Sequence, residues 1–394
     1  MNRSVYLLAA CQALMMTNAS LMITASALIG FSLADNKALA TLPLAFQFLA
    51  TMFTAIPASL LMGRLGRKPG FIIAGVLGMV GGGLATWAIM DRSFWLFACA
   101  TIFIGIFQGF GNYYRFTAAE IVPESHKSRA ISYVLAGGVI AAFLGPNMAN
   151  WTRYLEPSTE FAGSFLVVMA IYGLGMLIIS AAQLPGPVQR HESGHGRPLA
   201  EIARQPVFMV AVICAMLGYG IMTLVMTATP LAMKGTGHSF PDTAFVIQWH
   251  VLGMFAPSFF TGSLIDRFGC LRIMLAGVLL DLLCIGLNLH GEGVWHYWGA
   301  LLSLGLGWNF LFIGATTLVT ETYTPEEKPR AQALNDFIVF TTVAVASLSA
   351  GALQYSLGWQ AVNLGVIPLL LVVLASLYVL WRVQGWHHAR PATR

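Results

Sequence analysis

Long apolar stretches recur along almost the whole of this chain. Of its 394 residues, 57% are hydrophobic and only 9% are charged, and the mean hydropathy is +0.73. Such values lie far outside the range of soluble domains. A helix needs about 20 apolar residues to cross a hydrocarbon core about 30 Å thick. The sequence therefore predicts an all-α polytopic membrane protein without a sizeable soluble domain.

Twelve apolar stretches are long enough to be spans. The first is too long for the h-region of a signal peptide, so we interpret it as a retained span. The predicted spans are 5–33, 38–62, 71–90, 94–119, 130–150, 161–183, 207–232, 241–265, 271–290, 295–319, 331–355 and 358–383.

Positive charge is distributed unevenly between the connectors of these spans. With the N-terminus inside the cell, sixteen of the 21 Lys and Arg residues lie on the cytoplasmic side. Only Lys37, Arg92, Arg153 and Lys234 lie outside, and Arg115 lies within a span. The positive-inside rule therefore places both termini in the cytoplasm. Topology also explains the net charge of +5, so we expect no nucleic-acid partner.

The longest break between spans is rich in proline and glycine, which predicts an irregular linker. It covers residues 184–206 and separates six spans from six. We therefore predict an N-terminal six-helix bundle at 1–183, a cytoplasmic linker at 184–206 and a C-terminal six-helix bundle at 207–394.

The two halves also resemble each other in sequence. SLLMGRLGRK at 59–68 recurs as GSLIDRFGCLR at 262–272, and EIVPESHKSRA at 120–130 recurs as ETYTPEEKPRA at 321–331. Parallel repeats of this kind are one architecture of secondary transporters, in which the substrate binds near the membrane midplane between the halves.

The C-terminal copy, Gly262-Ser-Leu-Ile-Asp266-Arg267-Phe-Gly269-Cys-Leu-Arg272, resembles the loop signature of the major facilitator superfamily. The resemblance covers essentially the whole chain and implies twelve transmembrane helices in two pseudo-symmetric bundles. It also implies a loop that latches the cytoplasmic side closed. The alternative is simple positive-inside anchoring, and the N-terminal copy departs from the signature at Ser59 and Gly63. The implied gate residues are Arg64, Gly66, Arg67, Arg129, Gly262, Asp266, Arg267, Gly269 and Arg272.

The resemblance further implies that the first, fourth, seventh and tenth helices line a central cavity. Polar and aromatic residues on these helices favour an aromatic, largely neutral cavity suited to a planar or heterocyclic solute. Each of them can equally be a packing contact between helices. The candidate cavity residues are Asn18, Asn112, Tyr113, Tyr114, Arg115, Tyr219, Thr223, Trp308 and Asn309.

Ionisable groups within spans are costly and are functional candidates by default. Because no ATP-binding motif is present, we expect a gradient to drive transport, and protons are usual in the resembled family. The candidates for proton coupling are Arg115, Glu120, His250 and Asp281. A structural role is the alternative for each: Arg115 paired with Glu120 or snorkelling, His250 in packing, and Asp281 in a hydrogen bond between helices.

We expect no metal and no cofactor. The five cysteines form no CxxC pair. His191-Glu192-Ser193-Gly194-His195 formally fits the HExxH pattern of zinc hydrolases, but that chemistry needs a helix, and nearby Gly and Pro residues oppose one.

These features together predict a secondary active transporter of a small organic solute. The resemblance implies that it works by alternating access, as a monomer, in the bacterial inner membrane. Gly145-Pro146 resembles part of a glycine-proline motif that is enriched among proton-driven exporters of this superfamily, which favours efflux of a drug or metabolite. The alternative is a simple proline kink. The aromatic cavity is as compatible with uptake of an aromatic nutrient, such as a flavin-like vitamin. The alternative is a polytopic membrane enzyme or receptor without transport activity. An enzyme would need a dense cluster of His, Asp, Glu or Cys, and a receptor would need longer loops, so we expect no enzyme.

Overall fold

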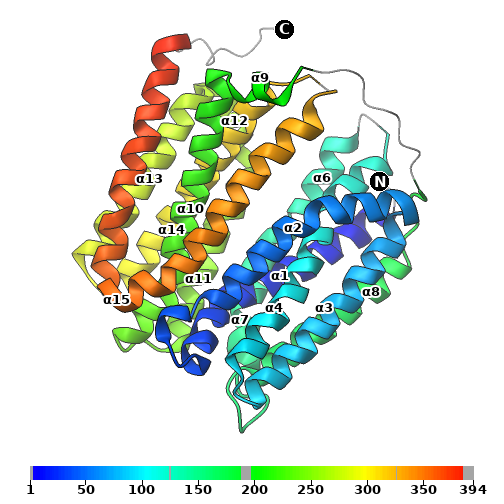
Figure 1. Cartoon of the computed structure of the whole chain (residues 1–394), viewed down its shortest axis with the longest axis vertical. Helices are drawn as coiled ribbons and strands as arrows, with labels where there is room; N and C mark the ends of the chain where they lie inside the picture. Colours follow the sequence, from blue (N-terminus) through cyan, green and yellow to red (C-terminus); the bar gives the residue numbers. More distant parts are fainter. Residues whose placement is uncertain (1–2, 124–125, 188–196, 325, 385–394) are drawn as a thin grey trace. The chain divides into compact units, whose positions relative to one another are not determined.

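The computed structural model describes residues 3–123, 126–187, 197–324 and 326–384 (Figure 1). This part of the chain contains helices and no strand. The helices are α1 (Arg3–Leu33), η1 (Lys37–Leu39), α2 (Leu42–Leu65), α3 (Arg67–Met90), α4 (Phe94–Gly111), α5 (Tyr114–Glu120), α6 (Lys127–Leu135), α7 (Gly137–Thr152), α8 (Ala162–Ser180), α9 (Leu199–Ala203), α10 (Pro206–Gly235), α11 (Phe240–Phe255), α12 (Ser258–Phe268), α13 (Cys270–His290), α14 (Val294–Thr320) and α15 (Lys328–Gln384). The predicted all-α fold is confirmed.

The described helices provide enough apolar length for the predicted spans. Ten of them are long and apolar enough to cross a membrane, or eleven when α11 and α12, which meet at a 45° bend, count as one span. The apolar part of α15, Arg330–Val383, has 54 residues and contains a non-helical residue at Gly358. Because one span needs about 20 residues, α15 holds two spans joined at this break.

Glycines with a positive φ angle follow three of the predicted spans. Gly66, Gly269 and Gly358 have φ angles of 94°, 91° and 81°, which only glycine adopts without strain. They follow the second, eighth and eleventh predicted spans. The repeat in sequence between 59–68 and 262–272 therefore corresponds to a repeated backbone turn.

The described residues form two compact units. Unit 1 contains those of 1–190 and 233–248, and unit 2 contains those of 191–232 and 249–394. In unit 1, α1 packs against α7, α2 against α4, and α3 against both α4 and α8. In unit 2, α13 packs against α14 and α15. Within each unit the long helices run side by side (Figure 1).

Residues 233–248 belong to unit 1 through aromatic and polar contacts. The ring of Phe240 lies 5.0 Å from that of Phe161, between centroids, and the Arg153 guanidinium lies 4.9 Å from the Phe240 centroid. The Asn147 amide donates to Gln248 Oε1 at 2.6 Å. The start of α11 is thereby packed on the loop between α7 and α8.

Candidate substrate site

Five aromatic rings from four helices of unit 2 form one cluster. The Tyr219 ring on α10 lies with its centroid 5.2 Å from Trp308, 5.5 Å from Phe312 and 6.2 Å from Phe340. Trp308 and Phe312 are one turn apart on α14 and stack with an interplanar angle of 10°. Phe255, at the end of α11, lies 6.3 Å from Trp308. We call these five residues the aromatic cluster.

The cluster is partly open and carries no charge. Trp308 is only 7% exposed, whereas its four partners are half-buried and keep part of their ring surface uncovered. The Trp308 Nε1 and Thr223 Oγ1 atoms are buried and have no hydrogen-bond partner among the described residues. Thr223 lies one turn after Tyr219 on α10. Because buried polar atoms are nearly always bonded, these two have unused capacity for a ligand or a water.

Asn309 follows Trp308 but has a different environment. Its amide nitrogen donates to the Met254 carbonyl and to Ser258 Oγ, both at 2.7 Å, and its Oδ1 accepts from Thr261 Oγ1 at 2.6 Å. These partners surround the bend between α11 and α12. Asn309 therefore fastens α14 to this bend.

The cavity candidates on α1, α4 and α5 contact their neighbours within unit 1. Asn18 is fully buried, and its amide lies 3.5 Å from the Val168 carbonyl. The Tyr114 ring is 3% exposed and packs 4.5 Å from Phe71. Asn112 is the half-buried C-cap residue of α4.

Two groups predicted for different roles meet in unit 1. Arg67, expected in the gate, forms a bidentate ion pair with Glu120, expected in proton coupling. The Arg67 guanidinium also lies 5.6 Å from the ring of Tyr113, whose hydroxyl donates to the Ala55 carbonyl at 2.9 Å. Arg115 is exposed, with its guanidinium 4.8 Å from the Phe116 ring.

The other two coupling candidates lie buried beside α14. His250 Nδ1 is 2.8 Å from the Leu301 carbonyl, and its Nε2 has no partner in the described structure. Asp281 on α13 is 2% exposed, and neither of its oxygens has a described partner. Its carboxyl lies against the Cα of Gly307, where a Cβ would overlap it.

The predicted gate residues surround the glycine turns. In the N-terminal copy, Arg64 is exposed, and the Arg67 amide donates to the Pro185 carbonyl at 3.3 Å beside Gly66. Arg129 lies in α6, but its side chain is outside the described structure.

In the C-terminal copy, the connection between α12 and α13 is a single residue, Gly269. Gly262, Asp266 and Arg267 lie exposed on α12, and the exposed Arg272 donates to the Phe268 carbonyl at 3.5 Å. The signature therefore occupies two helix ends rather than an extended loop.

Comparison with known proteins identifies the family. The family model of the Major Facilitator Superfamily matches residues 7–313 and 211–393. The chain belongs to the Major Facilitator Superfamily. It is 40% identical over 387 residues to the riboflavin transporter RfnT of Brucella anthropi, covering 97% of each chain. It is also 26% identical to the uncharacterised transporter YdeG of Bacillus subtilis, over 89% of this chain and 86% of that one.

Solved structures of transporters in this superfamily share the fold. A D-xylose–proton symporter superposes with a TM-score of 0.76 at 14% identity, covering 99% of each chain. The xylose transporter XylE of E. coli, in a partially occluded inward-open conformation, gives 0.68 at 12% identity, over 94% of this chain and 98% of that one. At these identities the likeness shows the fold alone. This superfamily member is a secondary transporter and not an enzyme, because its relatives are transporters.

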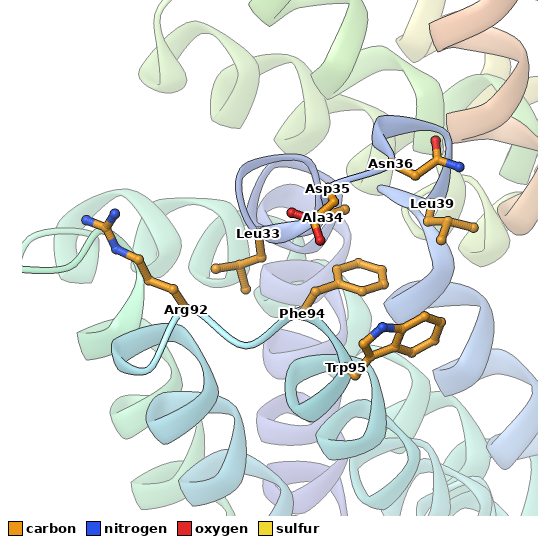
Figure 2. Close-up of a pocket in the computed structure, with 8 residues that line it drawn as sticks. All are labelled: Leu33, Ala34, Asp35, Asn36, Leu39, Arg92, Phe94 and Trp95. Atoms are coloured by element: carbon orange, nitrogen blue, oxygen red, sulfur yellow. The ribbon is translucent and has the colours of Figure 1, made fainter.

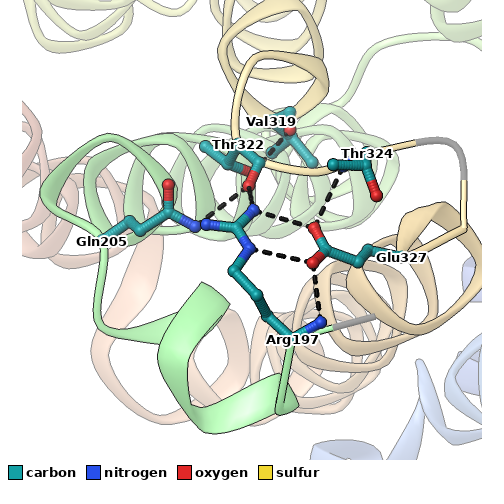
Figure 3. Close-up of polar contacts among 6 residues, drawn as sticks. All are labelled: Arg197, Gln205, Val319, Thr322, Thr324 and Glu327. Carbon is teal, nitrogen blue, oxygen red and sulfur yellow. Dashed lines mark hydrogen bonds and ion pairs between the residues drawn. The ribbon is translucent and has the colours of Figure 1, made fainter. Parts of the chain in front are cut away.

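One polar site of this superfamily member was not predicted from sequence. Arg197 donates to both carboxylate oxygens of Glu327 at 2.8 Å and to the Thr322 carbonyl at 3.0 Å (Figure 3). Gln205 donates to the same carbonyl at 2.9 Å. The end of the predicted linker is thereby bound to the loop between α14 and α15. The HExxH pattern at 191–195 lies outside the described residues.

A recess of about 340 Å³ lies in unit 1, at the end of α1 (Figure 2). Figure 2 shows Phe94 and Trp95, whose ring centroids are 5.3 Å apart, beside the turn after α1. None of the predicted site residues lines this recess. Its lining residues are Leu33, Ala34, Asp35, Asn36, Leu39, Arg92, Phe94 and Trp95.

Proposed function

We propose that this chain carries a riboflavin-like flavin across the bacterial inner membrane by alternating access. The proposal rests on one observation, the 40% identity to a riboflavin transporter over 97% of both chains. The uncharged aromatic cluster supports it, since a planar heterocycle binds best to aromatic surface with a few polar groups. The bacterial origin of the relatives supports the location.

The proposed architecture has two halves, 1–183 and 207–394, with 184–206 as a cytoplasmic linker and both termini in the cytoplasm. The excess of Lys and Arg on the side of the termini supports this orientation. We further propose a monomer, by analogy with the superfamily. In this arrangement the glycine turns at Gly66 and Gly269 lie at the cytoplasmic gate.

The contacts divide five of the candidate cavity residues into two groups. The side chains of Asn309 and Tyr113 already bind backbone carbonyls, so we assign them to positioning the helices. Tyr219, Thr223 and Trp308 have uncovered ring surface or unused polar atoms, so we assign them to the substrate. Asn18, Asn112, Tyr114 and Arg115 stay candidates on the other half.

The direct test is transport of riboflavin by the full-length chain in proteoliposomes. Riboflavin loaded on one side should exchange with labelled riboflavin on the other, and empty liposomes should show no exchange. The chain should also restore growth at low riboflavin concentration in a bacterial strain that neither makes nor imports it. Export without uptake would support efflux, and no exchange in either direction would refute the flavin proposal.

We propose that protons drive this transport. The candidates are Arg115, Glu120, His250 and Asp281, since ionisable groups in membrane segments often serve as proton relays. Accumulation of riboflavin should increase with an inward proton gradient, in which the outside is more acidic, and should decrease with a protonophore. Arg115→Gln, Glu120→Gln, His250→Gln and Asp281→Asn should be measured singly. If all four respond to the gradient like the parent chain, none of them carries the coupling.

A further inference from the structure

We propose that the aromatic cluster of unit 2, with Trp308 at its centre, binds the isoalloxazine ring of the flavin. This inference rests on the proposed function and assigns the part of the substrate that unit 2 recognises.

The first support is the arrangement of the rings. Trp308 is stacked on Phe312 and flanked edge-on by Tyr219 and Phe255, at interplanar angles of 69° and 72°. An indole held on three sides loses little freedom on binding, which favours affinity. Asn309, the next residue, is bound to the α11–α12 bend, so the backbone that carries Trp308 is also fixed.

The second support is the uncovered ring surface. A cluster that serves packing alone would be closed, yet Tyr219, Phe312 and Phe340 are each half-buried. They come from α10, α14 and α15, so the uncovered surface spans three helices. Isoalloxazine is a flat ring system of three fused rings, and stacking on aromatic side chains is the usual way to bind such a surface.

The third support is polar. One edge of isoalloxazine carries two carbonyl oxygens and an N–H group. Trp308 Nε1 offers a donor, and Thr223 Oγ1 offers a donor and an acceptor, and both lack a partner in the described structure. The cluster therefore has two polar atoms without described partners beside its rings. None of the five rings is charged, so the cluster itself provides no counter-charge for a flavin phosphate.

A second group of aromatic residues provides a matched control. Trp298 lies on α14 with Trp308, and its ring is 5.9 Å from Trp249 and 5.7 Å from Trp295. Trp295 is 71% exposed near the start of α14, as expected for an aromatic residue at a membrane interface. Trp298→Leu therefore removes a half-buried indole from the same helix without changing the aromatic cluster.

The test is a titration of riboflavin with the detergent-purified, full-length chain, followed by the quenching of flavin fluorescence that stacking causes. Trp308→Leu should raise the Kd about tenfold or more, in the range of base–aromatic stacking. Trp308→Phe keeps an aromatic ring, so its Kd should lie between those of the parent chain and Trp308→Leu. Trp298→Leu should bind like the parent chain. Lumiflavin, which has the ring but no ribityl chain, should compete with riboflavin, and ribitol should not.

The outcomes separate the two proposals. If the parent chain binds riboflavin and both Trp308→Leu and Phe312→Leu bind it equally well, the assignment of the cluster is refuted while the flavin function stands. If the parent chain binds no riboflavin, the flavin function is refuted and this inference with it. If Trp308→Leu does not yield folded protein, Phe340→Leu replaces it in the titration, because the Phe340 ring is half-buried. Unchanged riboflavin binding by Phe340→Leu and Phe312→Leu would likewise refute the assignment of the cluster.

Discussion

The side-chain amide of Asn309 donates a hydrogen bond to the Met254 carbonyl, 2.7 Å away, where α11 ends and the chain bends by 45° before α12. The residue before it, Trp308, lies in the aromatic cluster. Two neighbouring residues of α14 therefore have separate roles. Asn309 binds the bend between α11 and α12, and Trp308 contributes its ring to the aromatic cluster.

Asn309→Ala should destabilise the protein. It removes the hydrogen bonds to Met254, Ser258 and Thr261, and each buried group left without a partner costs about 1–3 kcal/mol. We expect the Tm of the detergent-purified chain to fall by several degrees in a thermal-shift assay. Thr316→Ala is the control, because Thr316 is exposed and bonds only within α14. Equal Tm values for the two variants would contradict this role for Asn309.

The spans and the internal repeat were predictable, but the environment of each side chain was not. Hydropathy determines which segments cross the bilayer, and the repeat identifies the two connections that contain Gly66 and Gly269. In contrast, a span that is apolar on every side has no amphipathic period to tell which face it turns to which neighbour. Trp308 and Asn309 were for this reason given the same role from sequence, and their contacts separate them.

The ion pair between Arg197 and Glu327 illustrates a different limit. The charges were visible in the sequence, but the partners lie 130 positions apart, and Arg197 is in a segment rich in Pro and Gly. Only the folded chain brings the end of this segment to the α14–α15 loop. The repeat EIVPESHKSRA and ETYTPEEKPRA marked that loop without indicating its partner.

Gly307→Ala should disturb the contact between α13 and α14. The added methyl group would overlap the Asp281 carboxyl, which is buried against Gly307. Overpacking of this kind typically costs about 1–3 kcal/mol. Adding Asp281→Ala to Gly307→Ala should restore part of the Tm lost in the single variant, because it removes the overlapping group. Gly286→Ala on α13, whose Cβ would have open space, should leave the Tm unchanged. Additive effects of Gly307→Ala and Asp281→Ala would exclude a direct contact.

Gly269→Ala should cost about 1–3 kcal/mol of stability, because the combination of φ 91° and ψ 148° is adopted almost only by glycine. Gly262→Ala lies in α12, six residues before this helix ends at Phe268. Its Cβ would have open space, so the substitution should be neutral or slightly stabilising. The comparison uses thermal shifts of the two variants. A neutral Gly269→Ala would show that the turn tolerates another backbone conformation.

The stabilisation provided by the Arg197–Glu327 pair should disappear only in acid. Hydrogen bonds from Arg197, and then from the backbone N–H groups of Thr324 and Arg197, lower the pKa of Glu327 from 4.5 to about 2. A carboxyl whose pKa is lower in the folded protein than in the unfolded chain stabilises the fold. This stabilisation is complete at pH values above the unfolded pKa, and it is lost as the pH falls towards the folded pKa. The Tm difference between the parent chain and Glu327→Gln should therefore be constant from pH 8 to about 5 and decrease below about 4.5. Asp91→Asn, at an exposed position after α3, is the control and should differ little from the parent chain. If the difference for Glu327→Gln instead changed between pH 6 and 8, the carboxyl would titrate near neutrality and would not be held by Arg197.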